Sequence, residues 1–163
     1  MPPDPGIFSL AQQVGERLRR QGLWLAVAES CTGGLLGAAL TDVPGSSAFF
    51  LGGVISYADR VKVEQLHVPD TTLRRYGAVS EQTAAAMATG VRQLLQADIG
   101  VSITGVSGPE AEGGKPVGLT FIGIDAPTLT STTLRFQWSG DRWDNRRRSV
   151  IAALELLVQT LGL

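Results

Sequence analysis

The chain has 163 residues and a formal net charge of −1, with 14 Lys and Arg against 15 Asp and Glu. With 44% hydrophobic and 18% charged residues, it is too apolar to be disordered and too evenly charged to attract nucleic acid or an anionic membrane over its whole surface. Its one histidine, His67, and one cysteine, Cys31, are too few for an intrachain disulfide or a structural zinc site, which takes about four such ligands. These counts predict a globular protein of the reducing cytoplasm.

The first eight residues are expected to form a flexible tail. Three prolines occur among the first five residues, where a secretory signal would have basic residues followed by an apolar run. The longest uncharged stretch, residues 43–58, is interrupted by proline and glycine and is too short to cross a bilayer. We therefore expect one domain over residues 9–163 and no membrane segment.

Hydrophobic spacing predicts alternating helices and strands along the chain. A helix from Ser9 to Gly22 precedes a buried strand over 23–28, a polar segment over 29–34 and a helix to about residue 40. A second strand is expected over 49–56. Next come short helices over 59–66 and 71–76 and a longer one that Ser80 caps and that ends near Leu95. The remaining predicted elements are strands over 99–104, 118–124 and 130–138 and a last helix from about Asp144.

This order of elements predicts an α/β fold. We expect a three-layer α/β/α sandwich around a mostly parallel mixed sheet of five to six strands, with one antiparallel pair. Ligands of such sheets bind beyond the carboxyl ends of the strands. Polar or glycine-rich segments at 29–34, 56–62 and 104–116 each follow a predicted strand, so they are expected to share one site.

Ser30 is a candidate nucleophile at the first of these segments. It lies between a predicted strand and a predicted helix, and Gly33 and Gly34 would let backbone N–H groups approach a ligand closely. Such a turn suits either a nucleophile or an anion cradle. The simpler alternative is that Ser30 or Thr32 only caps the helix.

A serine nucleophile needs a base, and the candidates are few. His67 stands between Leu66 and Val68, where an exposed or capping role is expected. The alternative is one of the two lysines, Lys62 and Lys115. A lysine can act as a base only where burial or nearby cations lower its pKa from about 10.4. Otherwise Lys62 is a solvated helix residue.

Other side chains have candidate roles around this pair. Tyr57, which precedes Lys62 by five positions, could relay a proton or hold the substrate. Cys31 could act as a nucleophile with His67 or be a small buried residue. The glycine-rich loop offers hydroxyls and amides suited to a phosphate or a carboxamide, from Thr104, Gly105, Ser107 and Gly108. One or two arginines could bind a phosphate, or they could form a solvated basic face; they are Arg135, Arg142, Arg146, Arg147 and Arg148.

At these residues the chain resembles the CinA C-terminal domain family, whose enzymatic members are nicotinamide-nucleotide amidohydrolases (PncC). The resemblance rests on six sequence blocks in the family's order. They are Ala-Glu-Ser-Cys-Thr-Gly-Gly at 28–34, Gly-Val-Ile-Ser-Tyr at 53–57 followed by Lys62, Gly-Ala-Val-Ser at 77–80, Thr-Gly-Val-Ser-Gly-Pro at 104–109, Lys-Pro-Val-Gly at 115–118 and Gly-Asp-Arg at 140–142.

The resemblance implies hydrolysis of the carboxamide of nicotinamide mononucleotide to nicotinic acid mononucleotide and ammonia, in pyridine-nucleotide salvage and without a metal or other cofactor. It implies that Ser30 is the nucleophile and that Lys62 with Tyr57 activates it and passes the proton to ammonia. Amides of Thr32, Gly33 and Gly34 would stabilise the oxyanion. The ribose and phosphate would be held by Thr104, Gly105, Ser107, Gly108 and Arg142. A homodimer is also a family-level expectation.

One segment departs from the family pattern. After Gly108-Pro109 the family usually continues with glycine, whereas this chain has Glu110, Ala111 and Glu112. Two carboxylates near a phosphate would repel it unless they point away. This departure motivates two alternatives, a nucleotide-binding or sensor module that has lost turnover and a hydrolase for another carboxamide.

Overall fold

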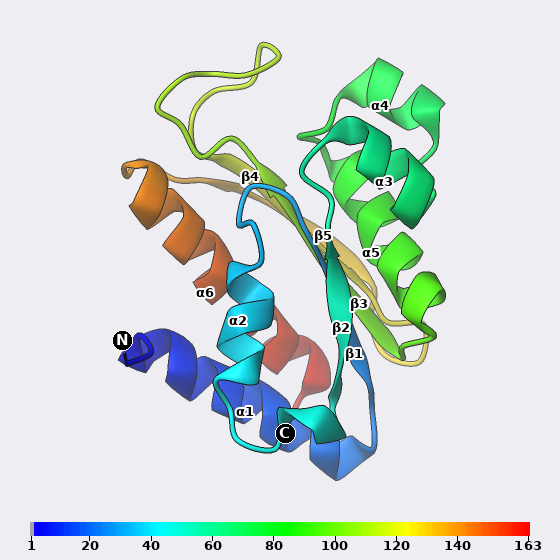
Figure 1. Cartoon of the computed structure of the whole chain (residues 1–163), viewed down its shortest axis with the longest axis vertical. Coiled ribbons are helices and arrows are strands. Elements are labelled where there is room, and N and C mark those ends of the chain that lie inside the picture. Colours follow the sequence, from blue (N-terminus) through cyan, green and yellow to red (C-terminus); the bar gives the residue numbers. More distant parts are fainter. Residues whose placement is uncertain (1) are drawn as a thin grey trace.

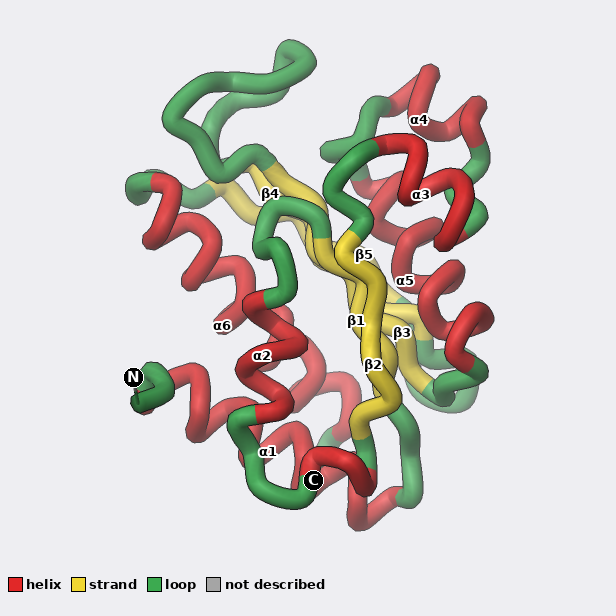
Figure 2. Tube along the Cα trace, in the orientation of Figure 1, coloured by secondary structure: helices red, strands yellow, loops and turns green. Residues whose placement is uncertain are grey.

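The computed structural model describes residues 2–163 (Figures 1 and 2). Its elements, in chain order, are α1 (Pro5–Gln21), β1 (Leu25–Glu29), α2 (Leu35–Thr41), a 3₁₀ turn (Ser46–Ala48), β2 (Phe50–Ile55), α3 (Asp59–Leu66), α4 (Asp70–Tyr76), α5 (Glu81–Leu95), β3 (Ile99–Gly105), β4 (Leu119–Asp125), β5 (Thr132–Gln137) and α6 (Arg142–Leu161).

The five strands described form one mixed sheet in the order β2-β1-β3-β4-β5. Strand β1 lies parallel to both β2 and β3, whereas β3 with β4 and β4 with β5 are antiparallel. Two pairs are therefore antiparallel, where one was predicted. The reason is that the segment between β3 and β4 contains no helix, and a parallel return needs a crossover connection, usually helical.

The predicted three-layer arrangement is confirmed. Helices α1, α2 and α6 cover one face of the sheet, and α3, α4 and α5 cover the other (Figure 1). The first face buries the larger hydrophobic cluster, which includes Leu18, Ile103 and Leu154, and the second buries Leu66, Met87 and Val91. Every residue of β1 is buried, as expected for a strand with helices on both faces.

The predicted N-terminal tail is shorter than expected. Helix α1 begins at Pro5 because Asp4 caps it: Asp4 Oδ1 accepts hydrogen bonds from the N–H groups of Gly6 (3.0 Å) and Ile7 (3.1 Å). Ile7 packs into the core. Residues 5–8 are therefore helical, and residue 1 of the predicted tail lies outside the described residues.

The other helices mostly agree with the prediction. Helix α3 has the predicted bounds, and Ser80 caps α5 by accepting a hydrogen bond from the N–H of Thr83 (3.1 Å). Helix α6 starts earlier than expected because Asp141 caps it by accepting from the N–H of Asp144 (2.9 Å). Within residues 2–163, none of the helices combines the length and apolar character that crossing a membrane requires.

Candidate active site

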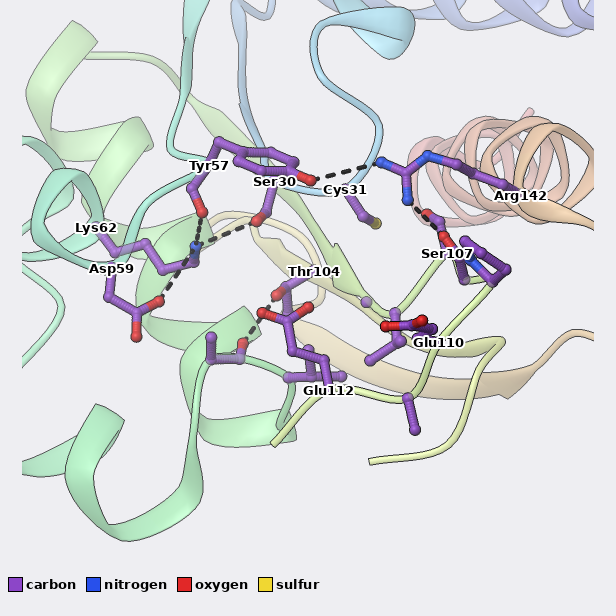
Figure 3. Close-up of a pocket in the computed structure, with 17 residues that line it drawn as sticks. Ser30, Cys31, Tyr57, Asp59, Lys62, Thr104, Ser107, Glu110, Glu112 and Arg142 are labelled. Atoms are coloured by element: carbon purple, nitrogen blue, oxygen red, sulfur yellow. Dashed lines mark hydrogen bonds and ion pairs between the residues drawn. The ribbon is translucent and has the colours of Figure 1, made fainter. Parts of the chain in front are cut away.

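The three segments that follow β1, β2 and β3 meet at one edge of the sheet. Ser30 follows β1, Tyr57 lies just after β2, and Gly105 ends β3. Because these strands are mutually parallel, their carboxyl ends lie together. They surround a cavity of about 380 Å³, which Arg142 of α6 also lines (Figure 3). This volume lies in the range of about 300–1,000 Å³ typical of small-molecule sites.

Lys62 and Ser30 are in direct contact at the base of this cavity. The Nζ atom of Lys62 lies 3.1 Å from Ser30 Oγ, and the lysine is only 1% exposed. Ser30 is also buried, and its own N–H donates to the carbonyl oxygen of Ile103 on β3 (3.0 Å). The structure therefore places Lys62 beside the candidate nucleophile and not on a solvated helix face.

Two backbone carbonyls also bind the amino group of Lys62. It donates to the carbonyl oxygens of Ser56 (2.6 Å) and Tyr57 (3.2 Å). A charged ammonium has three N–H donors and would use all three on these carbonyls and Ser30 Oγ. A neutral amine has two N–H donors for the carbonyls, which leaves its lone pair to accept the Ser30 proton. The geometry thus suits either protonation state.

The surroundings of Lys62 favour the neutral amine more than water does. Burial lowers the pKa of Lys62 below its ordinary value of 10.5, against the opposing charges of Asp59 and Glu112. Asp59 Oδ1 is 3.8 Å from Nζ, but its side chain is 66% exposed, so solvent screens the attraction. Lys62 thus has the lowered pKa that a lysine base requires.

Tyr57 reaches the cavity, but its hydroxyl faces away from the Ser30–Lys62 pair. Its ring is 62% exposed, and its hydroxyl lies 3.5 Å from Nη2 of Arg142 (Figure 3). Among the hydrogen bonds of residues 2–163, the one that joins Tyr57 to the Lys62 amine is accepted by the backbone carbonyl of Tyr57 and not by its hydroxyl. The structure therefore puts the phenol at the rim with Arg142, where it is suited to holding a substrate.

The predicted residues of the glycine-rich loop all line the cavity, together with Arg142. Thr104 is buried, and its hydroxyl donates to the carbonyl oxygen of Ala78 (2.8 Å). Arg142 donates from Nη1 to the carbonyl oxygen of Gly108 (2.6 Å). Gly108 has φ +98°, and a Cβ there would lie 2.7 Å from Val117, so this turn requires glycine.

Thr32, Gly33 and Gly34 do not line the cavity, contrary to the prediction of an oxyanion site there. Helix α2 begins only at Leu35, and the buried carboxylate of Glu29 accepts from the N–H groups of Leu36 and Gly37, both at 2.9 Å. It also accepts from the Thr32 hydroxyl (2.6 Å). Glu29 therefore occupies the helix terminus that was expected to face the substrate.

Cys31 and His67 are not brought together. Cys31 lines the cavity, whereas His67 is exposed at the end of α3 and borders a separate surface depression. Burial raises the pKa of the Cys31 thiol to about 11, although a hydrogen bond with Ser107 opposes the shift. A Cys-His pair is thus excluded, and the thiol is protonated at neutral pH.

A model of the CinA C-terminal domain matches residues 7–161 of the chain. The chain belongs to the CinA C-terminal domain family. It is 35% identical to a solved protein described as the competence/damage inducible protein CihA from Agrobacterium tumefaciens, with a TM-score of 0.94 and 98% of both chains covered. A CinA superfamily protein from Escherichia coli is 36% identical with a TM-score of 0.90, covering 94% of this chain and 89% of that one.

Curated relatives of this CinA domain are longer proteins. A CinA-like protein of Parasynechococcus marenigrum is 48% identical over 157 residues, which are 94% of this chain and 37% of the relative. A CinA-like protein of Chlorobium limicola is 47% identical over 154 residues, which are 91% of this chain and 36% of the relative. The chain thus spans little more than a third of the curated relatives that it matches.

Three residues of this CinA domain, Asp59, Ser56 and Asn145, contribute to the site without having been predicted, and a fourth, Arg146, was considered only as a phosphate ligand or as part of a solvated basic face. Asp59 stands three positions before Lys62 on α3, a spacing that the sequence displays and that predicts side-chain proximity. Ser56 contributes only its carbonyl oxygen, which no residue type signals. Asn145 and Arg146 on α6 donate hydrogen bonds to backbone carbonyls of the loops around the cavity. The sequence contains no signal that these side chains contact those loops.

Proposed function

We propose that the protein is an amidohydrolase that converts nicotinamide mononucleotide and water to nicotinic acid mononucleotide and ammonia, in the salvage of pyridine nucleotides. The observation that carries this proposal is the 3.1 Å contact between the buried amine of Lys62 and the hydroxyl oxygen of Ser30 in a cavity of about 380 Å³. Membership of the CinA family supports the substrate.

In the proposed reaction, neutral Lys62 accepts the Ser30 proton while Oγ attacks the carboxamide carbon. The tetrahedral intermediate collapses when the Lys62 ammonium protonates the amide nitrogen, which leaves as ammonia. This step forms an ester between Ser30 and the nicotinoyl group. Water then attacks the ester with Lys62 as the base, and the proton returns to Ser30 Oγ as the acid product leaves.

The substrate's charges fit the groups around the cavity. Arg142 and Tyr57 stand at one rim and are suited to the phosphate, whereas Glu110 and Glu112 lie on the side away from Tyr57 (Figure 3). Both carboxylates are exposed, so solvent screens their repulsion of a phosphate. The nicotinamide ring of this nucleotide is a pyridinium cation, and solvent screens its attraction to the same carboxylates as well.

The test is ammonia release from nicotinamide mononucleotide by the purified protein. We expect turnover by the wild type and a loss of at least about a thousandfold in Ser30→Ala. Ser47→Ala, at an exposed turn, is the control and should be fully active. Thermal unfolding should show that Ser30→Ala remains folded. Full activity of Ser30→Ala would exclude this mechanism.

A nucleotide-binding module without turnover is the second candidate function. The observation that favours it is that Glu110 and Glu112, which depart from the family pattern, line the cavity. Calorimetric titration would distinguish the two candidates. Tight nucleotide binding by the wild type with no ammonia release would favour the module.

A further inference from the structure

The first turns of helix α6 bind both loops that form the cavity. Residues 142, 145 and 146 lie on one helix face, since three- and four-residue spacings are neighbours on a helix. Arg142 donates to the Gly108 carbonyl (2.6 Å), and Asn145 Nδ2 donates to the Ser107 carbonyl (3.0 Å). On the other side of the cavity, Arg146 binds the turn that follows Ser30.

Arg146 reaches two consecutive carbonyls of that turn. Its Nε donates to the carbonyl oxygen of Cys31 and its Nη2 to that of Thr32, both at 3.1 Å. The guanidinium also lies 5.6 Å from the ring centroid of Trp143. Two nitrogens of its planar guanidinium fork are thus used by the turn that follows Ser30. Arg146 is therefore not suited to the phosphate-binding role considered from the sequence.

Asn145 is equally committed to the opposite loop. Its side chain is 1% exposed, and its Oδ1 accepts from the N–H of Gly140 (3.0 Å), which orients the amide so that Nδ2 faces Ser107. Neighbouring residues of one helix therefore hold the two loops from a common rigid support.

We propose that Arg146 and Asn145 are positioning residues. Together they fix the position of the turn at Cys31 and Thr32, which follows the nucleophile, relative to the substrate-binding loop at Ser107 and Gly108. The inference rests on the proposed function. Arg146 acts through the carbonyls of Cys31 and Thr32, which directly follow Ser30, so its removal misaligns the attack of Oγ on the substrate carbon. Asn145 acts through Ser107 and Gly108, so its removal weakens the grip on the nucleotide.

These roles give different kinetic signatures. Misalignment of a nucleophile is felt in the transition state and lowers kcat. A loosened substrate loop weakens binding of substrate and transition state alike and raises KM. A role limited to stability would lower the folded fraction and would change neither parameter per folded molecule.

The experiment compares Arg146→Gln, Arg146→Lys and Asn145→Ala with the wild type in ammonia release. We expect Arg146→Gln to lose about tenfold to a hundredfold in kcat with KM within about twofold, as for misplacement of about 1 Å. Arg146→Lys keeps the charge but loses the fork, so its kcat should be intermediate. Asn145→Ala should raise KM about fivefold or more and change kcat less.

The matched control is Arg147→Gln. Arg147 is the next residue on α6, but its guanidinium pairs with Asp4 on the surface, with Nε 2.7 Å from Oδ2. Its loss should leave kcat and KM unchanged. Guanidinium ion added to Arg146→Ala should restore part of the lost kcat, which a general loss of structure would not allow. Equal kinetic effects of Arg146→Gln and Arg147→Gln would overturn the proposal.

Two readouts do not depend on turnover. A fluorophosphonate probe should label Ser30 more slowly in Arg146→Gln than in the wild type, with Asn145→Ala close to the wild type. Calorimetry should show weaker nucleotide binding for Asn145→Ala only. If the wild type binds the nucleotide but releases no ammonia, the proposed function fails and these readouts still decide the positioning roles. Unchanged labelling and binding in both variants would overturn them.

Discussion

The amino nitrogen of Lys62 lies 3.1 Å from Ser30 Oγ, and its closest carboxylate among the ion pairs of residues 2–163, that of Asp59, is exposed and 3.8 Å away. A buried ion pair would have held the lysine in its charged form. Here Lys62 is buried without a close buried counter-ion, so its pKa is lowered and the neutral form of the amine is favoured. This combination distinguishes a candidate base from a lysine that only neutralises charge.

The first prediction concerns the pH dependence of ammonia release. Because only the neutral amine of Lys62 can accept the Ser30 proton, kcat/KM should rise with pH through the pKa of Lys62 in the free protein. Burial lowers that pKa, so the rise should be centred below 10.5. The measurement is kcat/KM from pH 5 upward. A rate independent of pH, or one that falls over this range, would contradict Lys62 as the base.

The second prediction uses Glu112. Burial lowers the pKa of Lys62, and the negative charge of Glu112 opposes this shift less than that of Asp59 does. Glu112→Gln removes that charge, destabilises the ammonium and should move the rising limb of kcat/KM to lower pH. Glu110→Gln is the matched control, since Glu110 lines the same cavity but is not among the charges that shift Lys62. An equal shift in both variants would indicate a general change in the charge of the cavity.

The third prediction concerns stability. Because the pKa of Lys62 is lower in the folded protein, the unfolded chain binds more protons between the folded pKa and 10.5. The free energy of unfolding should therefore rise with pH across that interval from this residue. Urea unfolding of the wild type and Lys62→Met at several pH values checks this, and the rise should be smaller in the variant. If the free energy of unfolding changed with pH equally in the wild type and the variant, burial would not destabilise the charged form of Lys62.

The alternation of helices and strands was predictable because it depends on local spacing. Helix α5 shows this: the Ser80 cap and the apolar positions after it are sequence-local and agree with the structure. The direction of β4 could have been predicted in the same way. No helix was expected between the strands over 99–104 and 118–124, and without a crossover connection the second strand returns antiparallel to the first.

The candidate site was predictable where a side chain itself reaches the cavity, as for Ser30, Lys62 and Arg142. Thr32, Gly33 and Gly34 do not line the cavity. Beside them, Glu29 binds the N–H groups of Leu36 and Gly37 from inside the fold, a contact that sequence neighbours do not indicate. For Arg146, the sequence left open whether it binds a phosphate or belongs to a solvated basic face. Only the packing of α6 beside the nucleophile turn decides what it binds.

The fourth prediction concerns Cys31, which adjoins Ser30 but should not be a nucleophile. With a pKa of about 11, only about one thiol in 10,000 is ionised at pH 7. Cys31→Ala should keep kcat within about threefold of the wild type, because it removes one small buried side chain. Iodoacetamide should react slowly at pH 7 and faster as pH rises toward 11. Rapid alkylation at neutral pH with loss of activity would contradict this assignment.

The fifth prediction concerns Gly90, where α5 supports the helix that carries Lys62. A Cβ at Gly90 would lie only 1.9 Å from the carbonyl oxygen of Leu66, the last residue of α3, so Gly90→Ala must push α3 away from α5. We expect a loss of about 1–3 kcal/mol in the free energy of unfolding. Because Lys62 moves with α3, kcat of the folded variant should also fall, about tenfold for a shift near 1 Å.

Urea unfolding and ammonia release under conditions where the variant is fully folded would measure the two effects of Gly90→Ala separately. Gln93→Ala, an exposed position on the same helix, is the control and should change neither. Unchanged stability would show that α3 can adjust without cost. Lower stability with wild-type kcat would mean that the contact between Lys62 and Ser30 does not depend on how closely α3 packs against α5.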